Sequence, residues 1–453
     1  MIVMKFGGTS VDGAEGLARA AGIVAEHRDS QPVVVTSAMA GVTDALVRLM
    51  ERARRGDLEA VTRGVDELGA RHAAVARELA PGDEALAAGL DAELRRLRVA
   101  LRSVRLRGEL SEPDADGIMG FGELMAQRLF AAALRRAGVE AEAVDPRTVV
   151  VTDARFGAAR PNPAATRDRA HRHLVPLASR GAVPVLGGFV GATPEGVPTT
   201  LGRGGSDLTA TVLARAIGAR EVQIWTDVDG LMTADPRLVP EARVLPRATF
   251  REAAELAGFG ARVLHPEAVD PAMASGVPVR VRNTLAPDRP GTLLVGDRSG
   301  HPERPAAVAC RAPVELLRLH DPDRVRDPRF LSALVRIAGR ADRLPLGIAI
   351  GAGGLELLLP EGRELPVGDG SSRVERRCGL AVVALVGEAL ARSPELWGRV
   401  LESAASAGIE RLFQGPEGVS LGMVVPREQA EDLVRRLHGR WVARPAPAGT
   451  GGA

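Results

Sequence analysis

The chain has 453 residues, 45% of them hydrophobic, which is enough for two or three domains with large cores. Its formal net charge is only +2, and the arginines are scattered among nearly as many acids, which argues against a nucleic-acid surface. No stretch approaches the roughly 18 consecutive apolar residues of a membrane span, and the N-terminus lacks a secretion signal. We therefore expect a cytoplasmic protein without a membrane or nucleic-acid partner. The two cysteines, Cys310 and Cys378, give no disulfide framework, and we expect both to be small core residues.

The first expected element joins an apolar strand, residues 1–4, to the sole lysine of the sequence. Of the 59 residues that are Lys or Arg, only Lys5 is a lysine. Residues 6–10, Phe-Gly-Gly-Thr-Ser, follow it and form a turn whose N–H groups can approach an anion. A compact ammonium suits such a place better than a wide, planar guanidinium. We interpret the segment as a phosphate site. The alternative is that the lysine was retained by chance in an ordinary turn.

Short β-branched runs alternate with helical patterns as far as residue 297, which is typical of an α/β sheet. The further strands that we expect are residues 32–36, 149–152, 183–186, 222–226 and 277–281. Residues 45–109 have a helical pattern, with apolar residues at steps of three and four from Leu86 to Val104. We expect a helical insertion there, in which His72 is a surface residue rather than a ligand.

Two glycine-containing segments precede expected helices. Glu123 follows Gly122 before the helix 124–134, where it either binds a cation or merely complements the helix dipole. Residues 199–207, Thr-Thr-Leu-Gly-Arg-Gly-Gly-Ser-Asp, run into the helix 208–217. In that loop Arg203 offers a fork for a carboxylate or phosphate, and Asp207 can hold an ammonium group or Mg²⁺. A plain capped helix is the alternative, but it would not need an arginine among three glycines.

The later parts of the chain indicate a nucleotide edge and a regulatory region. Acids, a glycine and a Pro-Arg step follow the strand 222–226, and ligands of open α/β sheets gather at such strand ends. Prolines between residues 287 and 305 mark a linker. After the linker, segments 308–319 and 380–386 share a plan, which suggests paired small modules.

Taken in order, these segments resemble the aspartate kinase pattern within the amino-acid kinase family. The matching segments are residues 5–11, 37–43, 122–123, 152–157, 202–207, 226–227 and 259–266. The resemblance implies an α/β amino-acid kinase fold, a mostly parallel sheet between helices, followed by two ACT-like α+β modules. The implied boundaries are a catalytic domain over 1–297, a linker over 298–305, ACT-like modules over 306–376 and 377–443, and a disordered tail over 444–453.

The resemblance also implies an activity, the ATP-dependent phosphorylation of the side-chain carboxylate of L-aspartate, in a homodimer joined through the ACT-like modules. Lys5 and the amides around Gly7 and Gly8 would neutralise the transferring phosphoryl group, and Asp207 would orient Lys5 and the substrate ammonium. The implied substrate contacts are Ser37 and Thr43 to the side-chain carboxylate, Glu123 to the ammonium and Arg203 to the α-carboxylate. The implied nucleotide contacts are Thr226, Asp227, Met232, Asp235, Arg237 and Arg262. Mg²⁺ would be held mainly by the ATP phosphates, without direct protein ligation.

Some positions depart from the family pattern. Met232 stands where an aromatic Tyr is common, and Arg262 replaces a usual Lys. The regulatory stretches 320–330 and 409–416 also differ, so we expect weak binding of an amino-acid effector. A kinase for another acidic or modified amino acid and a non-catalytic amino-acid sensor are the alternative functions. Retention of Lys5 favours a kinase, because a sensor needs no ammonium beside a phosphate.

Overall fold

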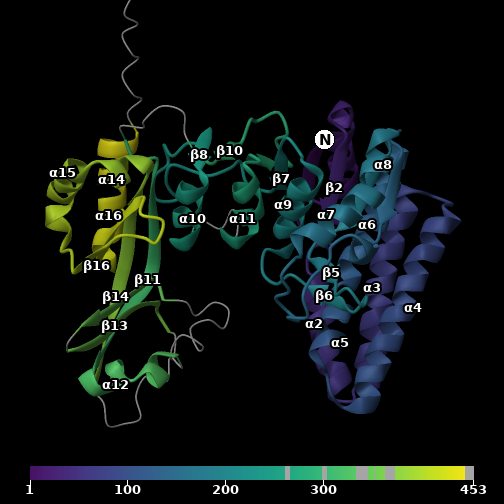
Figure 1. The fold of residues 1–453 in the computed structure, drawn as a ribbon, viewed down its shortest axis with the longest axis horizontal. Coiled ribbons are helices and arrows are strands. Elements are labelled where there is room, and N and C mark those ends of the chain that lie inside the picture. Colours follow the sequence, from purple (N-terminus) through teal and green to yellow (C-terminus); the bar gives the residue numbers. More distant parts are fainter. Residues whose placement is uncertain (261–265, 298–303, 333–344, 352, 363–372, 444–453) are drawn as a thin grey trace, which may run out of the picture. The chain divides into compact units, whose positions relative to one another are not determined.

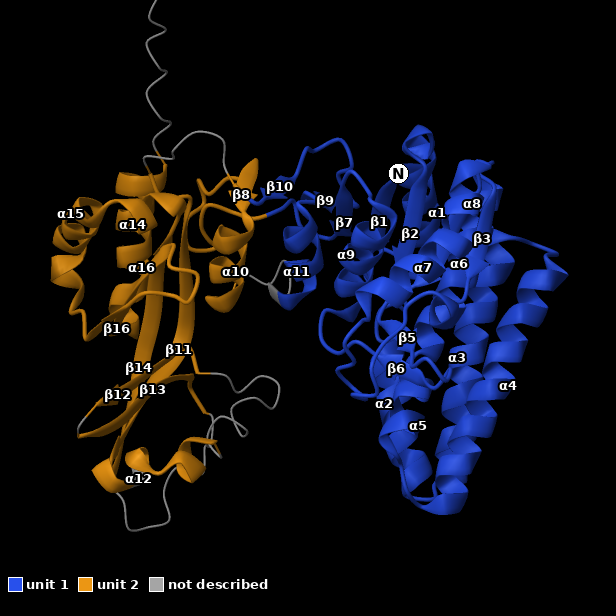
Figure 2. Ribbon diagram, in the orientation of Figure 1, with its two compact units in different colours: residues 1–230, 264–296 blue, residues 231–263, 297–453 orange. Residues whose placement is uncertain are grey.

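The computed structural model describes residues 1–260, 266–297, 304–332, 345–351, 353–362 and 373–443 (Figure 1). The chain divides into two compact units (Figure 2). Unit 1 comprises residues 1–230 and 264–296, and unit 2 comprises residues 231–263 and 297–453. The candidate site described below lies within unit 1.

Unit 1 is built on a mostly parallel sheet, whose strands in this unit run in the order β3-β4-β2-β1-β7-β9-β10. Their bounds are β1 Ile2–Phe6, β2 Pro32–Thr36, β3 Ala141–Val144, β4 Val183–Gly187, β7 Val222–Thr226, β9 Val279–Asn283 and β10 Thr292–Val295. Only β10 is antiparallel to its neighbour β9, the pairings from β3 to β9 being parallel. A small antiparallel pair, β5 Val190–Ala192 and β6 Pro198–Thr200, lies beyond the end of β4.

Helices cover both faces of this sheet. Ile2, Met4 and Phe6 of β1 point into a core shared with α1 and α6. Lys5 alternates to the opposite face, where it meets Asp207 of α9. The helices of unit 1 are α1 Gly13–Glu26, α2 Val42–Arg54, α3 Leu58–Leu79, α4 Glu84–Arg107, α5 Glu112–Met119, α6 Phe121–Arg136, α7 Pro163–His173, α8 Val175–Ser179, α9 Gly205–Ile217 and α11 Pro266–Ser275.

The expected strands of unit 1 are confirmed with one exception. Residues 32–36 and 222–226 form strands with the expected bounds, and the other strands differ by a few residues. Residues 149–152 make only isolated bridges, Val151 to Ala192 and Thr152 to Pro161. The expected strand there is wrong because the Val150 N–H folds back to the Pro146 carbonyl and the Val151 N–H bonds the Thr166 hydroxyl.

The helical insertion is confirmed, and it consists largely of the long helices α3 and α4, which pack side by side (Figure 1). The apolar stripe from Leu86 to Val104 is buried. His72 is buried rather than on the surface, so that expectation is wrong. Its Nδ1 lies 2.7 Å from the Leu68 carbonyl oxygen, and burial lowers the pKa of its imidazole. Burial in the core between helices holds this imidazole in its neutral form.

Unit 2 contains an antiparallel sheet in the order β12-β13-β11-β14-β16-β15. The strands of this sheet are β11 Ala307–His320, β12 Gly347–Gly351, β13 Gly354–Pro360, β14 Arg373–Val386, β15 Arg411–Phe413 and β16 Ser420–Pro426. Unit 2 also contains the short β8 Arg247–Thr249, which is not part of this sheet. Its helices are α10 Phe250–Gly258, α12 Pro322–Arg326, α14 Glu388–Arg392, α15 Pro394–Ala404 and α16 Arg427–Leu437. A parallel α/β sheet in unit 1 and an antiparallel α+β region in unit 2 confirm the expected fold class.

The segment 231–263 packs into unit 2. Ala234 and Val239 belong to the same apolar core as α15 and α16. The Thr249 hydroxyl donates to Glu388 at 2.9 Å, and the Val308 N–H donates to the Thr233 carbonyl. This segment is therefore held by residues far from it in sequence.

The cysteines only partly follow the expectation of small core residues. Cys310 is partly buried, and burial raises the pKa of its thiol to about 11. Cys378 is exposed, which contradicts the expectation, because the first half of β14 is largely exposed.

Candidate active site

A pocket of about 360 Å³ in unit 1 brings together most of the predicted catalytic and substrate-binding residues. Its lining residues are Lys5, Gly8, Ser37, Ala38, Met39, Ala40, Gly41, Thr43, Glu123, Phe189, Gly202, Gly204, Gly205, Ser206 and Asp207. They come from the ends of β1, β2 and β4, from the start of α6 and from the loop that begins α9. The carboxyl end of a parallel sheet is where such ligand sites form.

Lys5 and Asp207 form an ion pair at the centre of this lining. The Lys5 Nζ lies 2.6 Å from Asp207 Oδ1, and the two side chains are 10% and 15% exposed. Asp207 occupies the first turn of α9, where a carboxylate also complements the helix dipole. The preceding Gly204 has φ +70°, a conformation that favours glycine and lets the chain turn sharply into the helix. The pair therefore holds an ammonium group at a helix N-terminus, a suitable place for phosphate oxygens.

The glycine turn after β1 approaches the loop after β2 closely. A Cβ on Gly8 would lie 2.8 Å from the Ala38 carbonyl oxygen, so only glycine fits there without a shift. The Gly7 N–H donates to the Trp225 carbonyl at 3.0 Å, and Gly7 is not among the lining residues. The amide of Gly7 is thus engaged by β7, whereas Gly8 faces the pocket.

Ser37 flanks the pocket from the loop between β2 and α2, and Thr43 flanks it from the first turn of α2. Gly41, with φ +75°, lies directly before α2 and allows the loop to reverse. The Ala40 carbonyl accepts a hydrogen bond of 3.0 Å from Arg71 of α3. The helical insertion therefore supports the loop that carries Ser37 and leads to Thr43.

Glu123 is a buried carboxyl group in the first turn of α6. It is 4% exposed, and one of its oxygens, Oε2, has no hydrogen-bond partner. Burial raises the pKa of Glu123 to about 8, although N–H groups of Glu123 itself and Ala38 act in the opposite direction. An ammonium group arriving in the pocket would supply the missing partner for this carboxylate.

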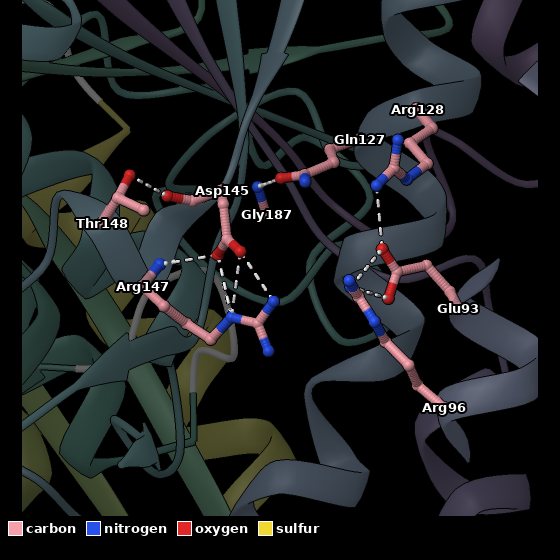
Figure 3. Close-up of polar contacts among 8 residues, drawn as sticks. All are labelled: Glu93, Arg96, Gln127, Arg128, Asp145, Arg147, Thr148 and Gly187. Atoms are coloured by element: carbon pink, nitrogen blue, oxygen red, sulfur yellow. Dashed lines mark hydrogen bonds and ion pairs between the residues drawn. The ribbon is translucent and has the colours of Figure 1, made fainter. Parts of the chain in front are cut away.

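Gln127, one turn after Glu123, was not singled out by the sequence analysis. Its Oε1 accepts a 2.6 Å hydrogen bond from the Gly187 N–H at the end of β4 (Figure 3). A Cβ on Gly187 would lie 2.9 Å from the Glu123 Cβ, so strand and helix touch at this point. This contact fixes how closely the start of α6, with Glu123, packs against the end of β4. A lone amide inside a helical pattern gives no signal of such a role.

Three other residues of the site were also missed by the sequence analysis. Phe189, with φ +66°, and Ser206 line the pocket. Asp116 of α5 lies behind it and bonds the segments that carry Gly157 and Thr200. Ser206 lies inside a motif that the sequence analysis identified, but neither Phe189 nor Asp116 stands in a recognisable pattern.

Arg203 lies in the loop between two lining glycines, and its side chain is exposed. Thr226 ends β7 and Asp227 follows it. Because β7 pairs in parallel with β1, both residues lie at the same edge of the sheet as Lys5. The Thr226 hydroxyl donates to Asp227 at 3.2 Å. These residues are near the expected places but do not line the pocket.

The remaining predicted nucleotide residues belong to unit 2 or lie outside the described residues. Met232 forms a β-bridge with Val244. Asp235 accepts hydrogen bonds from the Arg237 side chain at 2.6 to 3.1 Å, which holds the pKa of Asp235 below its usual value. Arg262 lies outside the described residues.

Comparisons with known proteins identify the family. The model of the amino acid kinase family matches residues 1–283. Lysine-sensitive aspartokinase 3 of Escherichia coli K12 is 35% identical over 460 residues, covering 97% of this chain and 98% of its own. The chain belongs to the aspartokinases. The chloroplastic aspartokinase 2 of Arabidopsis thaliana is 33% identical, with coverages of 96% and 83%.

Solved aspartokinase structures agree with this assignment. Aspartokinase III of E. coli in complex with lysine and aspartate has a TM-score of 0.85 at 34% identity, covering 97% of this chain and 99% of its own. The same enzyme in complex with aspartate and ADP has a TM-score of 0.77 at the same identity and coverages. The resemblance inferred from the motifs, the fold class and the expected enzyme class are therefore confirmed. Within the described residues of this aspartokinase, no helix is long and apolar enough to cross a bilayer.

Proposed function

We propose that this aspartokinase transfers the γ-phosphoryl group of MgATP to the side-chain carboxylate of L-aspartate, giving 4-phospho-L-aspartate and ADP. The observation that carries the proposal is the 2.6 Å Lys5–Asp207 pair in one pocket with Ser37, Thr43 and Glu123. The pocket thus offers a cation for a phosphate, hydroxyl groups for a carboxylate and a carboxylate for an ammonium. The E. coli relative in complex with aspartate and ADP supports the same pair of ligands.

The roles of the substrate contacts follow from charge. Glu123 pairs with the substrate ammonium, because its buried Oε2 has no other partner. Ser37, in the loop after β2, and Thr43, in the first turn of α2, donate to the side-chain carboxylate. Arg203 binds the α-carboxylate, since a guanidinium matches a carboxylate with two parallel hydrogen bonds.

The reaction needs alignment and charge stabilisation rather than a base. A side-chain carboxylate oxygen of aspartate, already ionised, attacks the γ-phosphorus, and the bond from that phosphorus to the ADP oxygen breaks. Lys5 stabilises the negative charge on the transferring group and on the leaving oxygen. Asp207 holds Lys5 in place through their ion pair. Mg²⁺ would be held mainly by the phosphates of ATP, without direct protein ligation, and would supply further positive charge to the transferring group.

The nucleotide site is the less complete part of the proposal. Gly8 faces the transferring phosphoryl group, and Gly7 supports the turn through Trp225. Thr226 and Asp227 contact the nucleotide at the end of β7, with Met232, Asp235, Arg237 and Arg262 as further contacts. A homodimer, ACT-like modules over 306–376 and 377–443 and a cytoplasmic location also stay predictions.

Product analysis with a panel of acceptors tests the function. L-aspartate, L-glutamate, D-aspartate and N-acetyl-L-glutamate are each incubated with MgATP, while ADP release is followed and hydroxylamine traps any acyl phosphate. We expect ADP and hydroxamate in equal amounts with L-aspartate alone. ADP release with another acceptor only would favour a sister kinase. Binding of an amino acid without ADP release would favour a sensor.

A further inference from the structure

Asp116 is a buried carboxylate that lies outside the pocket yet binds two segments of its wall. It belongs to α5 and is 2% exposed. Its oxygens accept hydrogen bonds from the Gly157 N–H at 2.9 and 3.0 Å and from the Thr200 N–H at 2.7 Å. The Thr200 hydroxyl donates to it as well, at 2.9 Å. Among the described residues it has no ion pair, so these donors compensate the burial of the carboxylate.

The two segments joined by Asp116 lie against each other. The Ala159 N–H donates to the Thr200 carbonyl at 2.9 Å, and the Thr152 and Thr199 hydroxyls lie 2.7 Å apart. A Cβ on Gly202 would lie 3.0 Å from the Gly157 carbonyl oxygen. Gly202 also has φ +75°, so the chain turns there into the loop of Arg203. The start of this loop is thus fixed against the loop that contains Gly157.

Arg203 is only three residues from Thr200. Three residues span at most about 10 Å, so a displacement of the Thr200 backbone should also move the backbone of Arg203. The next residue after Thr200, Leu201, donates its N–H to the Phe189 carbonyl at 2.9 Å, and Phe189 lines the pocket. Asp116 therefore controls the backbone from which both Arg203 and the Phe189 side of the pocket are built.

We propose that Asp116 is a positioning residue for aspartate recognition, which holds the Arg203 loop where its guanidinium meets the substrate α-carboxylate. This inference rests on the proposed function. It assigns to α5, which follows the helical insertion in the chain, a part in substrate binding that goes beyond packing. Because Asp116 acts through Arg203, its loss should weaken aspartate binding much more than nucleotide binding.

A double-mutant cycle tests the proposal on the full chain. The kcat and the KM values for L-aspartate and MgATP are measured for wild type, Asp116→Asn, Arg203→Ala and the double variant. We expect Asp116→Asn to raise the aspartate KM at least about tenfold and the MgATP KM less than about twofold, because the amide presents N–H groups to N–H donors. In the Arg203→Ala background, Asp116→Asn should add less than about twofold.

Glu93→Gln provides the matched control. Glu93, in the helical insertion, is also a 2% exposed carboxylate, but its partners are Arg96 and Arg128 (Figure 3). We expect this variant to lower the melting temperature while its aspartate KM stays within about twofold of wild type. An equal rise of the aspartate KM in Glu93→Gln would show that general destabilisation explains the effect, which overturns the proposal.

Two other results would also overturn it. One is an aspartate KM within twofold of wild type in Asp116→Asn, and the other is an undiminished effect of Asp116→Asn without Arg203. If Asp116→Asn does not fold, Thr200→Val replaces it and removes only the hydroxyl donor. Thr200→Val should raise the aspartate KM about two- to fivefold in an Arg203-dependent way, and no change would contradict the proposal. Failure of wild type to form an acyl phosphate would instead reject the proposed function.

Discussion

Lys5 forms a close ion pair in the wall of the pocket. Its Nζ lies 2.6 Å from Asp207, and both groups are mostly buried in the wall of the pocket. A guanidinium is wider and planar, so it does not fit the same contact with Asp207 and a phosphate oxygen. The ion pair thus explains why a lysine remains in a chain in which arginine supplies every other basic side chain of this type.

Lys5→Arg should lower kcat by about 10² to 10³ while the fold stays intact, the range for loss of one preorganised charge-stabilising donor. Steady-state kinetics and thermal unfolding measure the two effects. Arg19→Lys, which changes an exposed partner of Glu15, is the control and should leave kcat unchanged. A Lys5→Arg enzyme with more than about half the wild-type activity would contradict the role of Lys5.

Glu123 should make the stability of the ligand-free enzyme depend on pH. Burial raises its pKa from 4.5 to about 8, so between these values the folded chain keeps a proton that the unfolded chain releases. The contribution of Glu123 to the free energy of unfolding therefore falls as pH rises from about 4.5 to 8. Glu123→Gln removes this titration. The melting temperature of the variant minus that of wild type should therefore increase as pH rises from 5 to 8.5. Parallel melting curves over this range would contradict the prediction.

The same carboxyl group should influence binding in the opposite direction. Only ionised Glu123 pairs with the substrate ammonium, so the aspartate KM of wild type should fall as pH rises towards about 8. The MgATP KM serves as the internal reference. In Glu123→Gln the aspartate KM should be high and nearly independent of pH in this range.

The residues that sequence could identify differ in kind from those that it missed. Lys5, Arg203 and Asp207 stand in or next to glycine-rich turns, whose composition indicates close approach to a ligand. Asp116 and Gln127 lie inside ordinary helical patterns. Their hydrogen-bond partners Gly157 and Gly187 lie 41 and 60 residues further along the chain. Partners so distant are brought together only by the folded sheet.

At the scale of elements, β4 and α6 pack closely together beside Glu123. A Cβ on Gly187 would lie 2.9 Å from the Glu123 Cβ and 3.1 Å from its backbone carbonyl. Gly187→Ala should therefore separate strand and helix, destabilise the fold by about 1–3 kcal/mol and raise the aspartate KM. Gly22→Ala in α1, where the new methyl meets nothing within 4 Å, should instead stabilise by about 0.5–1 kcal/mol. Denaturant unfolding compares the two, and equal effects would contradict this reading of the contact.

The turn between β15 and β16 bears on regulation. The Gly415 N–H donates to the Ser420 hydroxyl at 3.1 Å, and the Glu417 N–H donates to Glu255 at 2.9 Å. Pro416 between them has no N–H. Loop amides that would otherwise hold a small amino acid are thus engaged or missing in this turn.

We therefore expect millimolar lysine or threonine to inhibit less than about twofold. A steady-state titration of each amino acid at subsaturating aspartate measures the effect, with D-lysine as a control for ionic strength. Strong, cooperative inhibition by either would reject this expectation and leave the catalytic proposal intact.

Elements were predicted best where local pattern and tertiary context agree. Residues 32–36 and 222–226 are apolar runs in the centre of a parallel sheet, and their bounds were predicted correctly. Residues 149–152 are also β-branched, but the Val150 and Val151 N–H groups bond Pro146 and Thr166, so the segment makes only isolated bridges. The insertion shows the converse, because its stripe from Leu86 to Val104 needs only the helical period to be recognised.

At the scale of the whole molecule, the two compact units are not divided only at the predicted linker, because residues before the linker also belong to unit 2. Residues 231–263 precede the linker but share the core and hydrogen bonds of unit 2, including Thr249 to Glu388 and Ser420 to Glu255. Linear sequence patterns place these residues with the catalytic region, because they cannot show which apolar faces meet. Because unit 2 is built from two separate stretches of the sequence, a cut at the linker separates residues that pack together.

Truncation after Asp297 should therefore remove the packing partners of residues 231–263 as well as the proposed dimer interface. Ala234 and Val239 would lose the apolar core that buries them. We expect the full chain to be a dimer and the truncated chain to aggregate or lose its cooperative unfolding transition, measured by light scattering and thermal melts. A well-folded, monomeric and active truncated chain would contradict this prediction.

Because the chain has a single lysine, reagents that modify amines can react with only one side chain, and that side chain lines the pocket. Acylating reagents should find two amines on the folded enzyme, Lys5 and the N-terminus, and a protease specific for lysine should cut the unfolded chain once. Modification of Lys5 consequently reports occupancy of the pocket directly, without an engineered label. For the same reason, any lysine acetylation of this chain would fall on Lys5, the residue proposed above to stabilise the transferring phosphoryl group.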